Sequence, residues 1–232
     1  MIDPPWPEYE RRVQNYPLVK KQEKLESWSF NNIRDLWINN LAASPSFIFL
    51  WTGTQHLDHG RQLFKHWGFK RCEDIVWIKS NINSVNYKQD HTDKSSLLKK
   101  TKEHCLVGIR GDNKKANESH FIHPNIDTDV IMTEEPSIGN FNKPQEIKTI
   151  IERFCLGRKR LELFGNNSSI KEGWVVIGKD VANTNWNKDK YKQWFEGTEN
   201  LNGYEGGRYT GTTNHIENLR PKSPPKSGVN TK

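Results

Sequence analysis

Cysteine and long apolar runs are scarce in this chain of 232 residues. Its three cysteines, Cys72, Cys105 and Cys155, are an odd number at wide spacing, which fits neither a disulfide framework nor a metal motif. No run approaches the roughly 20 apolar residues of a membrane span, and the opening residues 1–5 do not resemble a signal peptide. We therefore expect buried free thiols in a soluble protein that is not secreted.

Apolar residues make up 33% of the chain and the mean hydropathy is −0.89, but 9 Trp and 10 Phe are present. Burial of each such ring contributes about 2–3 kcal/mol, so we expect a hydrophobic core. Lys and Arg number 35 against 28 Asp and Glu, a net charge of +7. This excess is compatible with a polyanionic partner without requiring one.

Short apolar segments alternate with amphipathic ones, which is typical of α/β proteins. Helical spacing predicts one helix over 57–67 and a second that opens at 143–146 and ends at Gly157. We expect a largely parallel sheet, with a hairpin as one option for its last two strands. The apolar segments predict strands at 46–51, 74–79, 105–109, 129–132, 160–164 and 174–177.

The composition divides the chain into a domain over 1–196 and a basic tail over 197–232. The tail is rich in Gly, Asn, Pro and Lys, so we expect it to be mostly disordered. Residues 80–102 form a long polar loop. Only Met1 and Ile2 precede a strand-to-loop transition, so we expect a domain that is truncated at its N-terminus or dispenses with one strand.

Asp3-Pro4-Pro5-Trp6 is the clearest chemical signal. The two prolines make the loop rigid, so a carboxylate and outward carbonyls could accept both hydrogens of an exocyclic amine. Trp6 offers a face on which a base could stack, with the amine directed at an electrophilic methyl group. The alternative is an Asp-Pro turn beside a core Trp.

Several longer motifs follow this one in a fixed order. They lie at 46–51, 71–79, 101–108, 143–144, 161–165 and 173–174. In this order the chain resembles the MT-A70-like family of adenine-N6 methyltransferases over nearly all of residues 3–180. The resemblance implies a Rossmann-like class I methyltransferase fold with permuted motifs, S-adenosylmethionine as cofactor, and a nuclear heterodimer of one catalytic and one partner subunit.

Other segments resemble the non-catalytic partner branch of the family. They lie at 121–129, 133–136, 165–170 and 216–224. Where catalytic members carry the polar groups that grip the cofactor, this chain has Asn166, Ser168, Ser169, Lys179 and Asp180. The resemblance therefore implies that the partner subunit binds S-adenosylmethionine and that this chain is inactive by itself.

Two positions keep residues that match cofactor contacts of the family, Lys102 and Glu162. Partner subunits usually have Glu-Pro-Pro-aliphatic where this chain has Asp3-Pro4-Pro5-Trp6. An active methyltransferase therefore stays an alternative, with Asp3, Pro4, Pro5 and Trp6 as its catalytic residues. A free-standing nucleic-acid-binding module is a third hypothesis.

Basic residues match the nucleic-acid groove of the partner branch by position. Arg61 and Lys65 are four residues apart, so they share one helix face, and such a surface would neutralise phosphates without reading sequence. Ordinary solvated charges are the alternative, and the substrate, RNA or DNA, stays open. His56 and His59 are expected to be solvated side chains, with no metal site. The predicted groove residues are Arg61, Lys65, Lys70, Arg71, Lys114 and Lys115.

Overall fold

The computed structural model describes residues 1–13, 26–82, 97–111, 126–137, 139–155 and 159–195. Within these ranges, one sheet has the strand order β1-β3-β2-β4 and a second pairs β5 with β6. The strands are β1 (Ser46–Thr52), β2 (Lys70–Ser80), β3 (Lys102–Arg110), β4 (Val130–Glu134), β5 (Leu161–Leu163) and β6 (Val175–Ile177).

The backbone around Ile2 joins the two sheets. The Ile2 amide donates to the Phe49 carbonyl over 2.7 Å, and its carbonyl accepts from the Trp51 amide over 2.9 Å. On the other side, the Leu163 amide donates to the Met1 carbonyl over 3.0 Å, so Ile2 forms parallel bridges to both β1 and β5. The chain leaves this bridge at Asp3, at the edge where the carboxyl ends of β1 and β5 also lie.

The sheet is mixed. β3 runs antiparallel to both β1 and β2, whereas β2 pairs with β4, and β5 with β6, in parallel. The prediction of a largely parallel sheet therefore fails at β3, which runs opposite to the other described strands. The hairpin considered for the last two strands is wrong: the connection between β5 and β6 contains the 3-10 helix η5 (Asn167–Ser169) and carries the chain back to the starting edge.

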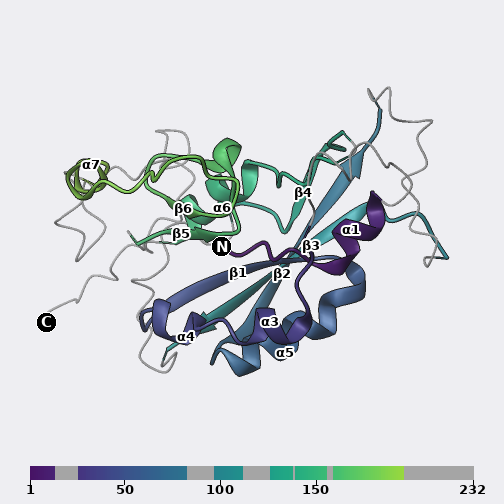
Figure 1. Cartoon of the computed structure of the whole chain (residues 1–232), viewed down its shortest axis with the longest axis horizontal. Helices are drawn as coiled ribbons and strands as arrows, with labels where there is room; N and C mark the ends of the chain where they lie inside the picture. Colours follow the sequence, from purple (N-terminus) through teal and green to yellow (C-terminus); the bar gives the residue numbers. More distant parts are fainter. Residues whose placement is uncertain (14–25, 83–96, 112–125, 138, 156–158, 196–232) are drawn as a thin grey trace, which may run out of the picture.

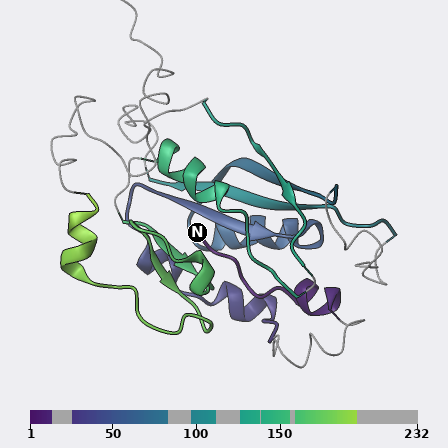
Figure 2. The same ribbon diagram turned by 90° about the horizontal axis from the view of Figure 1, so that it is seen from above.

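Helices cover both faces of the sheet and make a three-layer α/β arrangement (Figures 1 and 2). On one face α5 (Leu57–His66) packs Leu63 and Phe64 against Leu50 of β1. On the other face α6 (Glu146–Phe154) packs Ile147 and Ile151 in a core that includes the buried rings of Trp51, Trp77 and Trp174. The shorter helices are α1 (Pro7–Arg12), α3 (Phe30–Arg34), α4 (Ile38–Leu41), η1 (Thr54–His56) and α7 (Lys188–Gln193).

All six predicted strands and both predicted helices are present, with ends shifted by a few residues. The cysteines are free, but Cys72 is exposed where burial was expected, while Cys105 and Cys155 are buried. In the ranges that the structure describes, no helix is long and apolar enough to cross a membrane. The predicted tail over 197–232, Lys114, Lys115 and most of the 80–102 loop lie outside the described residues.

Candidate functional site

Asp3 lies at the carboxyl edge of β1 and β5, with both carboxylate oxygens engaged. Its Oδ1 accepts a hydrogen bond from the Tyr9 hydroxyl over 2.7 Å, and its Oδ2 lies 3.3 Å from Nζ of Lys143. Burial raises the pKa of Asp3 to about 6, although Lys143 and the Tyr9 hydrogen bond favour the ionised form. Groups of this chain thus occupy the positions from which a substrate amine would approach the carboxylate.

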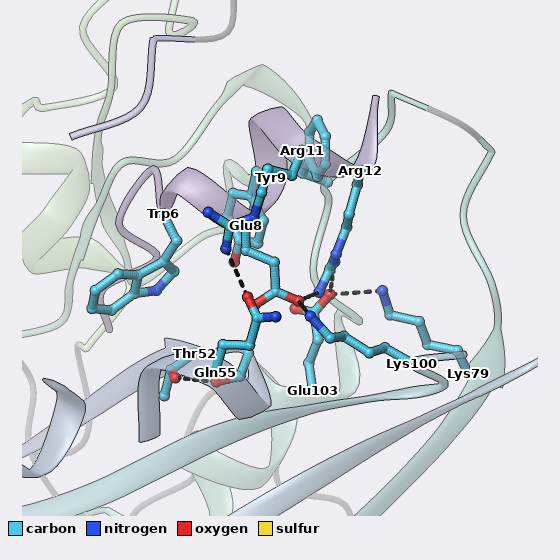
Figure 3. A network of polar contacts seen from close by, with 12 residues as sticks. Trp6, Glu8, Tyr9, Arg11, Arg12, Thr52, Gln55, Lys79, Lys100 and Glu103 are labelled. Carbon is cyan, nitrogen blue, oxygen red and sulfur yellow. Dashed lines mark hydrogen bonds and ion pairs between the residues drawn. The ribbon is translucent and has the colours of Figure 1, made fainter. Parts of the chain in front are cut away.

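Asp3 belongs to a larger polar group, which we call the edge network. Figure 3 shows the part of it around Glu8, Arg12 and Glu103. At its centre Glu103 is 1% exposed and binds Arg12 over 2.5 Å, Lys79 over 2.6 Å and Lys143 over 2.9 Å. Burial raises the pKa of Glu103, but these three cations hold it well below its usual range. The members of the edge network are Asp3, Glu8, Tyr9, Arg12, Lys79, Lys100, Glu103 and Lys143.

Glu8 connects the edge network to the loop after β1. It is fully buried, and its Oε1 lies 2.8 Å from Arg12 and 3.4 Å from Lys100. Its Oε2 faces Gly53, where an added Cβ would come within 1.9 Å of that oxygen.

Gly53→Ala is therefore expected to destabilise the fold by about 1–3 kcal/mol, because overpacking would push a buried carboxylate from its cations. Gly68→Ala is no suitable control, since Gly68 has a φ of 77°. Ala43→Gly, at an exposed position after α4, serves instead, and chemical unfolding compares the two variants. Wild-type stability in Gly53→Ala would contradict the packing described.

The asparagine variant of Asp3 tests its raised pKa. An ionised Asp3 costs stability, because its pKa is higher in the folded than in the unfolded chain, so this cost grows as pH rises from about 4 to about 6. Relative to wild type, Asp3→Asn is expected to gain about 2 kcal/mol in the free energy of unfolding between pH 4 and pH 7. Chemical unfolding across that range measures the gain, and parallel pH profiles of the two proteins would refute it.

Trp6 is buried inside the chain. Its side chain is 1% exposed, its indole N–H donates to the Trp51 carbonyl over 2.8 Å, and its ring stacks on His56 at 4.8 Å. The Pro4 carbonyl accepts from the Trp6 amide over 2.8 Å and the Pro5 carbonyl from the Trp28 amide over 2.9 Å. The ring and both carbonyls that sequence reasoning assigned to a bound base are thus used in folding.

The two residues predicted for the cofactor are in different environments. Glu162 is 6% exposed, and its Oε2 lies 2.6 Å from Nζ of Lys148, which also donates to the Ser169 carbonyl. Lys102 is exposed at the start of β3. The carboxylate is already neutralised by a buried lysine, so these residues do not fit S-adenosylmethionine as a pair.

The turn after β5 also uses its polar groups internally. Asn166 Oδ1 accepts from the Ser168 amide over 2.9 Å, and the Asn166 amide donates to Ser169 Oγ over 3.1 Å. Lys179 and Asp180, after β6, are exposed. The turn therefore uses these groups for hydrogen bonds within the chain.

The predicted groove residues that the structure describes are exposed. Arg61 and Lys65 lie on α5, and Arg61 contacts Asp58 over 2.8 Å, while Lys70 and Arg71 begin β2. The start of β2 is at the opposite edge of the sheet from Asp3, since Lys70 pairs with Ile109 near the end of β3. The proposed nucleic-acid surface and the acceptor loop are therefore separate features.

The two histidines near α5 are less exposed than expected. His56 is 8% exposed, its Nδ1 lies 3.1 Å from Nδ1 of His59, and burial lowers its pKa to about 4. Within the described residues there is no group of three or more His, Cys, Asp or Glu side chains suited to a metal ion. The pair is best described as a part-buried hydrogen bond beside Trp6.

Sequence reasoning missed most of the edge network. Three of its members come from segments that are far apart in the sequence: Tyr9, Glu103 and Lys143. Glu103 and Lys143 lie within the motifs at 101–108 and 143–144, but no motif included Tyr9. One usable signal was a charged residue directly before the apolar run of β3. Another was the Glu8 and Arg12 pair, spaced by four residues on α1.

The layers, the mixed sheet and the polar cluster at its carboxyl edge define an α/β protein, consistent with a methyltransferase-type fold. The chain belongs to the MT-A70 family, whose profile matches residues 1–180. This confirms the resemblance stated from the motifs.

The chain is also similar to individual proteins of known subunit type. The chain is 43% identical over 226 residues to the N(6)-adenosine-methyltransferase non-catalytic subunit METTL14 of Drosophila melanogaster, covering 97% of this chain and 54% of that protein. It is 45% identical over 140 residues to the non-catalytic subunit MTB of Arabidopsis thaliana (60% and 17%). Against the human catalytic subunit METTL3 it is 33% identical over 135 residues (58% and 22%). The chain spans about half the length of the METTL14 relatives it matches.

Proposed function

We propose that this chain is the non-catalytic, stabilising and nucleic-acid-binding subunit of a heterodimeric adenine-N6 methyltransferase. Its partner is a catalytic MT-A70 subunit similar to METTL3, and its fold is a permuted Rossmann-like class I domain. The names of the similar METTL14 and MTB proteins support this assignment.

One observation carries the proposal: the acceptor loop is already filled by its own chain. Asp3 is held by Tyr9 and Lys143, and Trp6 is buried beneath His56. A base could bind here only by displacing a hydrogen-bonded hydroxyl and a buried ion pair, which costs several kcal/mol. The polar groups of this loop are thus used within the chain instead of holding a substrate.

We assign the cofactor to the partner subunit for a similar reason. Glu162 is paired with Lys148, and the turn over 166–169 closes on itself. S-adenosylmethionine would supply the methyl group in the complex, while this chain contributes structure and phosphate contacts. Adenine in RNA or in DNA is the proposed substrate, and the nucleus is the proposed compartment.

Co-expression with the catalytic subunit tests the assembly. We expect the two chains to purify as a 1:1 complex. We also expect the complex to bind S-adenosylmethionine and this chain alone not to bind it. A monodisperse isolated chain that binds S-adenosylmethionine would favour an active enzyme. A monodisperse chain that does not bind the catalytic subunit would favour a free-standing module.

Charge removal tests the basic surface. In the complex, Lys70→Gln with Arg71→Gln is expected to weaken binding of unrelated oligonucleotides to a similar extent, because phosphate contacts carry no sequence information. The slope of log affinity against log salt should fall by about 0.7–0.9 per lost contact. Lys99→Gln, compared with Lys70→Gln alone, is the matched single-charge control, because Lys99 is exposed at the opposite edge. An unchanged salt slope in the double variant would refute the surface.

A further inference from the structure

We propose that Trp186 and the lysines of α7 form a separate contact site for single-stranded nucleic acid, in which a base stacks on Trp186 and phosphates bind Lys188, Lys190 and Lys192. This inference rests on the proposed function and adds a second contact site to it. Trp186 is 51% exposed, and all three lysines are exposed.

The backbone on each side of Trp186 is fixed by an asparagine. The Asn185 side chain accepts from the Val176 amide over 3.2 Å and donates to the Trp174 carbonyl over 3.0 Å, so it pairs with the edge of β6. Asn187 caps α7 by accepting from the amides of Asp189 and Lys190. Trp186 is therefore displayed on a preorganised turn, which reduces the entropy cost of binding a ligand.

Helix α7 is attached to the domain through Tyr191 and through Phe195, which follows the helix. The Tyr191 hydroxyl accepts from the Arg160 amide over 3.0 Å and donates to the Gly173 carbonyl over 3.4 Å, and Phe195 is buried. The Trp186 ring lies against Tyr191 with centroids 5.1 Å apart and planes at 50°. One side of Trp186 is thus supported, while about half of its surface stays open to solvent.

The charge next to this ring is positive. α7 carries three lysines against one acidic residue, Asp189, and Lys188 and Lys192 share a face because they are four residues apart. Among the described residues no ion pair is found for the three lysines. Their ammonium groups can therefore contact phosphates without first breaking a salt bridge to another described residue.

An exposed aromatic ring beside cations suits unpaired nucleotides. Every base offers a face for stacking, but the bases of a duplex are covered by their neighbours, so the site favours single strands. The residues before the ring, Ala182, Asn183 and Thr184, are exposed and mostly polar. A protein interface would be expected to surround such a ring with apolar side chains, so nucleic acid is the better occupant.

The site lies away from the predicted groove. Both views place α7 at one end of the long axis of the molecule, well separated from α5 (Figures 1 and 2). A single nucleic-acid strand bound at both α5 and α7 would therefore be held at two points.

Binding of labelled single-stranded RNA and DNA to the intact complex tests the proposal. We expect Trp186→Ala to weaken binding about five- to a hundredfold, and Trp186→Phe to keep most of the affinity because it keeps a stacking face. Replacing all three lysines by Gln should lower the salt slope by about 2. Trp37→Ala removes another exposed ring, 75% exposed on the α3–α4 side, and should change nothing.

The outcomes separate this inference from the proposed function. If Trp186→Ala binds like wild type while the Lys70 and Arg71 variant is weakened, the α7 site is refuted and the proposed function stands. If Trp186→Ala instead loses the catalytic subunit, the ring belongs to a protein interface and the inference is overturned. If the wild-type complex binds neither oligonucleotide, nucleic-acid binding fails for both.

Discussion

Replacing Glu103 by Gln is expected to lower the free energy of unfolding by about 3–5 kcal/mol, because it leaves buried cations without their counter-ion. Glu103 is 1% exposed and contacts Arg12, Lys79 and Lys143 within 2.9 Å. Gln keeps the shape of the side chain, so the loss would report the charge and not a cavity. No other described carboxylate of the edge network contacts so many cations.

Chemical unfolding at several pH values tests this expectation. The folded pKa of Glu103 is depressed, so its contribution is present above the unfolded pKa of about 4.3 and is lost as pH falls toward the folded pKa. The difference between wild type and variant should therefore shrink below about pH 4. Glu73→Gln, at an exposed position of β2, should stay within about 0.5 kcal/mol of wild type. A loss below about 1 kcal/mol in Glu103→Gln would mean that the edge network is not structural.

The positions of the strands were predicted from local patterns, but the direction of β3 was not. Each buried strand is a short apolar run, and β1 shows this most clearly over Phe47 to Trp51. Direction depends on which strands become neighbours, and β3 joins β1 and β2 only through long-range pairing. The polar stretch over 80–102 lacks the apolar spacing of a crossover helix, which is what a parallel pair would need.

The acceptor motif could be identified from the sequence, but its state could not. The rigid Asp-Pro-Pro-Trp loop favours amine binding. The sequence next to it does not show which residues contact the loop in the folded chain. Tyr9, six residues on, and Lys143, which is 140 residues away, reach Asp3 only in the folded chain. Similarly, nothing in the sequence around Glu162 shows that it pairs with Lys148 on α6.

Methyl transfer by the heterodimer is expected to depend very unequally on the two subunits. Losing the acceptor carboxylate of the catalytic partner should lower turnover by two or more orders of magnitude, a barrier increase of about 2.7 kcal/mol or more. Losing Asp3 should have a small effect, since Tyr9 and Lys143 already occupy its carboxylate. Asp3→Asn serves as the control for folding, because it preserves the size of the side chain.

The non-catalytic role of this chain is therefore tested most directly by turnover of the co-expressed heterodimer with Asp3→Ala in this chain, measured on adenine-containing RNA and DNA oligonucleotides. We expect turnover within about threefold of wild type, under 1 kcal/mol of barrier, with the complex intact. A loss of two or more orders of magnitude in an intact complex would contradict it and would make Asp3 a catalytic residue.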